Sequence, residues 1–120
     1  MSHAVTFSHH RLDVYRLAVQ LAVQVRRICD RMPRGSGPLA DQMIRAAQST
    51  ALLIAEGANR AATGDKRQRF RAARGEVGEC AAALEMAAAM GLVPVGESLA
   101  AQELAARISA MTHRLAQRFA

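Results

Sequence analysis

Apolar residues recur at spacings of three and four along the first part of the chain, which is the period of an amphipathic helix. The repeat predicts a helix over residues 7–32, and its members are Leu12, Tyr15, Val19, Ala22, Val25, Cys29 and Met32. A second series widens this apolar face and consists of Val14, Leu17, Leu21 and Ile28. The combined face is wider than one neighbouring helix would cover, so part of it suits a contact between subunits.

The same period predicts three further helices, over residues 38–60, 64–90 and 95–119. The apolar series of the second helix is Leu39, Met43, Ala46, Thr50, Leu53 and Gly57. The breaks between helices read PRGSGP, AATGD and GLVPVG. Pro38 is placed as the first residue of the second helix and Thr63 as the N-cap of the third. No strand pattern occurs, and the connections are short. The sequence therefore predicts one all-α domain over residues 1–120, an antiparallel up-and-down four-helix bundle.

The composition is basic and poor in aromatic residues. The formal net charge is +6, and fifteen of the sixteen basic residues are Arg, whose forked guanidinium binds phosphate through paired donors. One Tyr and three Phe residues offer few platforms on which bases could stack. We therefore expect acidic partners, with contacts to phosphates rather than to bases.

Small residues crowd the predicted second and third helices. Gly75 and Gly78 fall inside the third, where each costs about 1 kcal/mol relative to Ala. Small side chains bury little apolar area, but they let helices approach closely. Together with the wide apolar face of the first helix, they favour burial of apolar surface between subunits. A monomer with a small apolar core is the alternative.

The two cysteines, Cys29 and Cys80, have neither pairing nor metal-ligand spacing, which is typical of reduced core residues in the cytoplasm. The opening MSHAVTFSHH lacks the apolar run of a signal peptide. The most apolar stretch, AAALEMAAAMGLVPV, carries Glu85 and is too short to span a bilayer. We therefore expect a cytoplasmic protein with no membrane partner.

The sequence contains no arrangement typical of a catalytic or metal site. A di-iron bundle requires Glu-x-x-His motifs on two helices, and no Glu in this chain precedes a His at that spacing. His113 is the one His inside the predicted bundle, while His3, His9 and His10 suit at most adventitious metal binding. Ser49 and the cysteines lack a neighbouring base, and no P-loop or dinucleotide fingerprint occurs. We expect no enzymatic activity, no cofactor and no resident metal.

Two stretches carry a more specific pattern, LADQMIRAAQSTALLIAEGANRA at residues 39–61 and RFRAARGEVGEC at residues 69–80. The first reads L-x-x-Q-x-x-R-A-x-x-S, then I-A-E-G, then an Arg three residues on. The second supplies a Phe, a small-residue step and a Glu. With FSHHRLDVYRLAVQL at the start, the chain resembles, over residues 7–119, the four-helix-bundle proteins encoded by intervening sequences in bacterial 23S ribosomal RNA genes.

This resemblance implies a soluble bundle that assembles into a ring, commonly a homopentamer with a basic surface, and no enzymatic activity. A related branch of the family, the accessory proteins of diversity-generating retroelements, works beside a reverse transcriptase and binds nucleic acid. The resemblance therefore implies two kinds of partner, further copies of this chain and nucleic acid.

Polar residues form a line along the predicted second helix, because offsets of 3, 7, 14 and 18 residues return to nearly the same azimuth. The line consists of Gln42, Arg45, Ser49, Glu56 and Arg60, and Glu79 of the third helix is a partner for Arg45 or Arg60. Glu56 and Arg60 are also an i,i+4 pair in the favoured order. One interpretation is a structural polar seam that fixes helix register or subunit orientation. The other makes Arg45 and Arg60 part of an anion site.

The run IAEGANRAATGDKRQRFRAARGE, residues 54–76, is strongly basic. Its cations are Arg60, Lys66, Arg67, Arg69, Arg71 and Arg74. Those in the first turns of the third helix oppose the helix dipole, where a merely solubilising sequence would place acids. Repeated around a ring, they would form a belt that holds phosphates with little regard to base identity. A solvated helix face is the alternative for this span.

The sequence therefore predicts a non-enzymatic homo-oligomer that binds RNA or DNA through these six residues, largely without sequence specificity. The alternative function is a structural scaffold or adaptor that docks an acidic protein partner.

Overall fold

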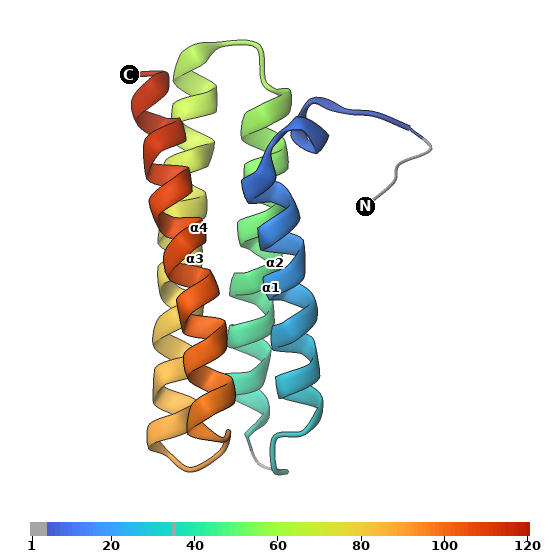
Figure 1. The fold of residues 1–120 in the computed structure, drawn as a ribbon, viewed down its shortest axis with the longest axis vertical. Helices are drawn as coiled ribbons and strands as arrows, with labels where there is room; N and C mark the ends of the chain where they lie inside the picture. The colour runs from blue at the N-terminus through green and yellow to red at the C-terminus, as the bar shows by residue number, and fades with distance from the viewer. Residues whose placement is uncertain (1–4, 35) are drawn as a thin grey trace.

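The computed structural model describes residues 5–34 and 36–120, so His3 lies outside the described residues. A 3-10 turn, η1 (Ser8–Arg11), precedes four α-helices. The helices are α1 (Asp13–Asp30), α2 (Gly37–Asn59), α3 (Thr63–Ala89) and α4 (Val95–Arg118). Consecutive helices run in opposite directions and lie side by side, with α1 packed on both α2 and α4 (Figure 1). The described part of the chain contains no strand. The prediction of an all-α four-helix bundle is confirmed.

The start of the first helix differs from the prediction. The α-helix begins at Asp13, six residues later than expected, because Leu12 has an extended backbone with φ −98° and ψ 118°. Leu12 turns the chain so that η1 lies against α2 rather than projecting beyond the bundle. His9 accounts for this, since its Nδ1 lies 2.8 Å from Asn59 Nδ2 and its ring packs against Tyr15. Leu12 continues the apolar period, so periodicity alone does not reveal the break.

The start of the third helix also differs. Ala62, not Thr63, occupies the N-cap position, and no side chain makes a capping hydrogen bond at this described helix start. Thr63 is therefore the first helical residue, and the prediction of its capping role was wrong. The connection from α2 is instead closed by Lys66, whose ammonium donates to the carbonyls of Gly57 and Ala58 at 3.2 and 2.9 Å. A long side chain from the next helix thus satisfies the carbonyl end of α2.

The core lies along the bundle axis and combines many alanines with Val, Leu and Ile side chains and one Phe. On α1 the second apolar series is fully buried, whereas most of the first series is only partly buried at the edge of the core. On α2 the predicted apolar series contained Leu53, but Leu53 is half-buried and its neighbour Ile54 is buried. The buried series is therefore displaced by one residue at this point of the helix. The largest fully buried side chains are Phe70, Leu21, Met43, Ile54, Leu84 and Ile108. None of the helices in the described ranges has a segment both long and apolar enough to cross a membrane.

Candidate nucleic-acid interface

The charge of the molecule is segregated along the bundle axis. The antiparallel arrangement brings together residues 5–21, 49–74 and 109–120, at the end where the C-terminus lies (Figure 1). We call these residues the basic end. They contain ten Lys and Arg against three Asp and Glu, a net charge of +7. The other described residues contain six basic and seven acidic side chains, a net charge of −1. The excess positive charge of the chain therefore resides entirely at one end.

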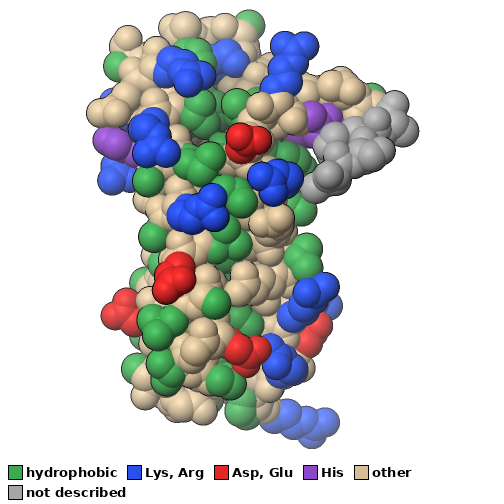
Figure 2. Space-filling model, viewed as in Figure 1, with side chains coloured by type: hydrophobic (Ala, Val, Ile, Leu, Met, Phe, Trp, Pro, Cys, Tyr) green, Lys and Arg blue, Asp and Glu red, His purple; other side chains and the backbone are tan. Residues whose placement is uncertain are grey.

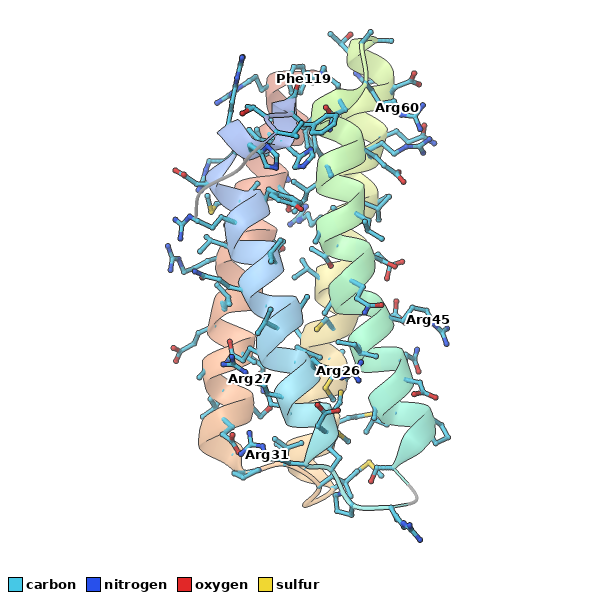
Figure 3. All side chains as sticks on the ribbon, turned by 90° about the vertical axis from the view of Figure 1, so that its right-hand side faces the viewer. Arg26, Arg27, Arg31, Arg45, Arg60 and Phe119 are labelled. Atoms are coloured by element: carbon cyan, nitrogen blue, oxygen red, sulfur yellow. The ribbon has the colours of Figure 1, made fainter. Side chains whose placement is uncertain are left out.

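On the face shown in Figure 2, blue Lys and Arg side chains predominate in the upper half, while acidic and basic side chains mix in the lower half. Arg60 lies at the same end as Phe119, and Arg31 lies toward the opposite end (Figure 3). The six basic residues singled out in the sequence all belong to the basic end. They differ, however, in what their side chains contact.

Two of the six, Lys66 and Arg67, contact Phe119 near the end of the chain. Lys66, besides closing α2, lies 5.5 Å from the centroid of the Phe119 ring, a distance suited to a cation–π contact. Arg67 Nη1 donates to the Phe119 carbonyl at 3.0 Å and so ties α3 to the end of α4. Both side chains are half-buried. Their positive charge contributes to the field of the basic end, but part of their donor capacity is already used within the fold.

Arg69 belongs to the interface between α2 and α3. Its Nε lies 3.3 Å from Glu56 Oε2, an ion pair that lacks the alignment of a hydrogen bond. Glu56 therefore pairs across the helices with Arg69, and the described residues show no ion pair between Glu56 and Arg60. The favourable i,i+4 spacing on α2 does not decide the partner, because Arg60 follows the last helical residue and has an extended backbone.

The remaining three, Arg60, Arg71 and Arg74, are exposed. Arg71 and Arg74 line a groove of about 480 Å³ between α3 and α4, together with His113 and Gln117. Arg74 Nη1 lies 3.1 Å from His113 Nδ1. Because a guanidinium can only donate, His113 Nδ1 accepts this hydrogen bond, and a neutral imidazole then carries its proton on Nε2. The groove thus combines two cations with further donors.

The model of one protein family matches most of the chain. It is the family of 23S rRNA-intervening sequence proteins, and the match extends over residues 10–114. The chain belongs to this family. The resemblance predicted from the sequence is thereby confirmed. No curated protein matches the chain.

In this 23S rRNA-intervening sequence protein, the structure places further basic residues at the basic end that the sequence analysis did not single out. A second groove, of about 290 Å³, lies between α1 and α4 and is lined by Arg11, Arg114 and Arg118, with Asp13 as its acidic side chain. Arg114 and Arg118 are an i,i+4 pair on the exposed surface of α4. That spacing was visible in the sequence, but only the antiparallel packing places the pair at the same end of the bundle as the basic residues of α3.

The predicted polar line of this 23S rRNA-intervening sequence protein lies at the boundary between α2 and α3. Gln42 Nε2 donates to Glu79 Oε1 at 2.8 Å. The structure thus pairs Glu79 with Gln42, whereas the sequence predicted Arg45 or Arg60 as its partner. Glu76 lies beside Glu79, and burial together with this second carboxyl raises the pKa of Glu76, which nearby Arg45 opposes. Ser49 is half-buried on the same helix.

Arg45 and Arg60 are fifteen residues apart on the α2 segment, which corresponds to about 22 Å at 1.5 Å per helical residue. Arg45 extends from the lower half of the bundle, while Arg60 lies near the top of it (Figure 3). The geometry therefore does not bring these two residues into one anion site. The contacts of the polar line that the structure does provide join one helix to its neighbour.

Among residues 5–34 and 36–120, the thiols and imidazoles show no assembled reactive centre. Burial raises the pKa of Cys80 to about 12, and burial and Asp30 raise that of Cys29, so both thiols are protonated at neutral pH. The rings of His9 and His10 lie against each other, with centroids 4.3 Å apart and planes tilted by 59°. In the described ranges, no cluster of three or more His, Cys, Asp and Glu side chains is arranged to hold a metal ion.

Proposed function

We propose that this protein is a non-enzymatic homo-oligomer that binds RNA or DNA through its basic end, largely without regard to base sequence. The observation that carries the proposal is the segregation of charge, +7 at one end against −1 over the other described residues. Neutralising phosphates releases the counterions condensed on a nucleic acid, which gives a cluster of Lys and Arg most of its affinity for any such polymer.

The side chains at this end favour contact with the backbone over contact with bases. Nine of its ten cations are Arg, which can donate two parallel hydrogen bonds to one phosphate. The aromatic residues are mostly engaged, since Phe70 is 1% exposed and stacks on Phe119, and Tyr15 packs against His9. Phosphate contacts fix position but carry no sequence information, so low specificity follows.

Apolar patches outside the core support self-association. One groove, of about 520 Å³, runs between α1 and α2, and its apolar lining includes Val19, Val23, Ile44 and Leu52. A second set of exposed apolar residues flanks the turn between α3 and α4, and consists of Met86, Met90, Val95 and Leu99. Two different patches suit a head-to-tail contact, which closes into a ring when the rotation between subunits allows it. A homopentamer is the ring that family membership favours.

The test is a fluorescence-anisotropy titration of labelled RNA and DNA at several salt concentrations, on protein whose subunit number is fixed by light scattering. Binding through several phosphates requires log affinity to fall with log salt, by about 0.9 per phosphate on duplex DNA. Replacing Arg60, Arg114 and Arg118 together with Ala should flatten this slope. The matched control replaces Arg34, Arg45 and Arg107, which are also exposed but lie outside the basic end.

Two results would overturn the proposal. Equal loss of affinity in both triple variants would mean that the position of the charge is irrelevant. If the intact oligomer binds no nucleic acid even at low salt, the alternative of a scaffold or adaptor that docks an acidic protein takes its place.

A further inference from the structure

The groove between α3 and α4 has the properties of a defined phosphate site rather than of a general basic surface. Its charged and polar side chains are Arg71 and Arg74 on α3 and Thr112, His113 and Gln117 on α4, and no acidic side chain lines it. The last residue, Ala120, also belongs to the lining, so the two arginines lie beside backbone groups but no Asp or Glu side chain. By contrast, the groove between α1 and α4 includes Asp13.

The hydrogen-bonding groups of this groove are mainly donors. Arg71 and Arg74 can only donate, and His113 donates from Nε2 because its Nδ1 accepts from Arg74. The amide of Gln117 adds an NH₂ group. The contact with His113 also fixes one edge of the Arg74 guanidinium, so that side chain is already oriented. A pre-oriented set of charged donors is the arrangement that phosphate oxygens require.

Gly75 lies in the lining of the same groove, one residue after Arg74. A Cβ at this position would meet nothing within 4 Å, and the backbone φ of Gly75 is not positive. The packing of the single chain therefore does not require glycine here, although glycine inside a helix costs about 1 kcal/mol relative to Ala. The absence of a side chain has one local effect, which is to keep the wall of the groove open between the two arginines and His113.

From these three features we infer that the α3–α4 groove binds one phosphate group of a nucleic acid, with Arg71 and Arg74 as its cationic ligands and His113 Nε2 as a neutral donor. The inference rests on the proposed function and deepens it, because it replaces a diffuse basic surface by a site of stated residues. Gly75 acts as the residue that leaves room for the phosphate and the adjoining sugar.

The direct experiment follows backbone amide and arginine side-chain NMR signals of the full chain during titrations with three probes. They are inorganic phosphate, a 5′-phosphorylated oligonucleotide and the same oligonucleotide with a 5′-hydroxyl. Chemical-shift changes centred on Gly75, His113 and Gln117 support the site, whichever of the three probes produces them. If both oligonucleotides produce them, internal phosphodiesters bind, and if only the phosphorylated one does, the site takes a terminal phosphate. Shifts that avoid these residues with all three probes overturn the inference.

A pair of variants tests the groove without removing charge. Gly75→Leu should block the groove and lower oligonucleotide affinity at least tenfold, since a Leu side chain projects into the space that the phosphate needs. Gly78→Leu is the matched control, because Gly78 is also an exposed glycine of α3 with nothing within 4 Å of an added Cβ, but it does not line this groove. Both replacements favour the helix, so circular dichroism should show folded proteins.

The outcomes separate this inference from the proposed function. If wild type binds nucleic acid and Gly75→Leu binds equally well, the groove is not the site, while the proposed function stands. If neither wild type nor any variant binds nucleic acid, the proposed function fails, and the inference fails with it. If Gly75→Leu loses binding and light scattering shows that its oligomer has dissociated, the loss of binding follows from the loss of assembly. Gly75 then serves a contact between subunits, and the inference is overturned.

Discussion

The ring of Phe70 on α3 occupies the space that a side chain at Gly57 on α2 would need. A Cβ built at Gly57 would lie 2.8 Å from Phe70 Cε1, closer than real Cβ contacts. Phe70 has little freedom to withdraw, because it is 1% exposed and its ring stacks on that of Phe119 at a centroid distance of 6.0 Å. This contact gives the glycine of the I-A-E-G run a physical reason, which is the close approach of α2 and α3.

We predict that Gly57→Ala destabilises the fold by about 1–2 kcal/mol. Overpacking typically costs about 1–3 kcal/mol, and the better helix propensity of Ala returns up to about 1 kcal/mol. Gly75→Ala is the matched control and should stabilise by about 0.5–1 kcal/mol, since its methyl group meets no neighbour. Urea denaturation at equal protein concentrations measures both. Equal effects in the two variants would show that Phe70 yields freely.

Lys66 should contribute to stability more than to binding. Its ammonium donates to two carbonyls at the end of α2, and hydrogen bonds from a charged donor contribute about 1.5–3 kcal/mol when well shielded. For this half-buried side chain we expect Lys66→Ala to destabilise by about 1–2 kcal/mol.

The control for this prediction is Arg71→Ala. Arg71 is exposed, so its removal should change stability by less than about 0.5 kcal/mol. Thermal unfolding of the two variants provides the comparison, and a larger effect for Arg71→Ala would reverse the assignment of roles.

Glu76 should destabilise the seam between α2 and α3 at neutral pH. Burial and Glu79 raise its pKa in the folded state, so the folded protein binds this proton more tightly than the unfolded chain. The stability that this tighter proton binding contributes is fully present below the pKa of Glu76 in the unfolded chain, about 4.3. It is lost as the pH rises through the pKa of Glu76 in the folded state. Glu76→Gln should therefore raise the melting temperature at pH 7 by about 1–3 °C, as a few tenths of a kcal/mol imply.

The same substitution should have little effect near pH 3.5, where Glu76 is already protonated. Glu85→Gln, on an exposed part of α3, is the control and should change the melting temperature neither at pH 7 nor at pH 3.5. A gain in melting temperature that persists unchanged at pH 3.5 would point to a cause other than charge.

Cys80 should make the fold sensitive to alkali. Burial holds its pKa at about 12, whereas an unfolded thiol ionises near pH 8.5. The folded state thus retains a proton that the unfolded state loses, so stability should decline from about pH 9 to pH 12, by up to about 1.4 kcal/mol per pH unit. Urea denaturation at pH 8 and pH 10 measures this slope. Cys80→Ala should show a shallower one, and identical slopes would exclude the thiol as the cause.

Periodicity was sufficient to predict the four helices, because each helix buries one face and the breaks contain Gly and Pro. It did not predict the break at Leu12, where an apolar residue keeps the period while His9 and Asn59 hold the preceding turn against α2. It also did not rank the two apolar series of the first helix, since both have helical spacing and only packing shows that Val14 is buried and Tyr15 partly buried.

The basic residues were predicted as one cluster, and the structure divides them by their neighbours. Lys66 and Arg67 meet carbonyls that belong to other helices, which no local pattern reveals. Arg114 and Arg118 were overlooked because they lie forty or more residues from the predicted cations in the sequence, whereas antiparallel packing places them at the same end of the bundle, in a groove with Arg11. Long-range contacts therefore decide which cations are free to meet a ligand.

Segregated charge also gives the bundle a permanent electric dipole moment directed along its long axis. A polyanion exerts a torque on such a molecule before any contact forms and turns its positive end forward, although at physiological salt this acts only within about 8 Å. In a ring whose subunits all point the same way, the individual moments would add. The assembly would then have one face that attracts polyanions and one that does not, so that it would engage nucleic acid from a single side.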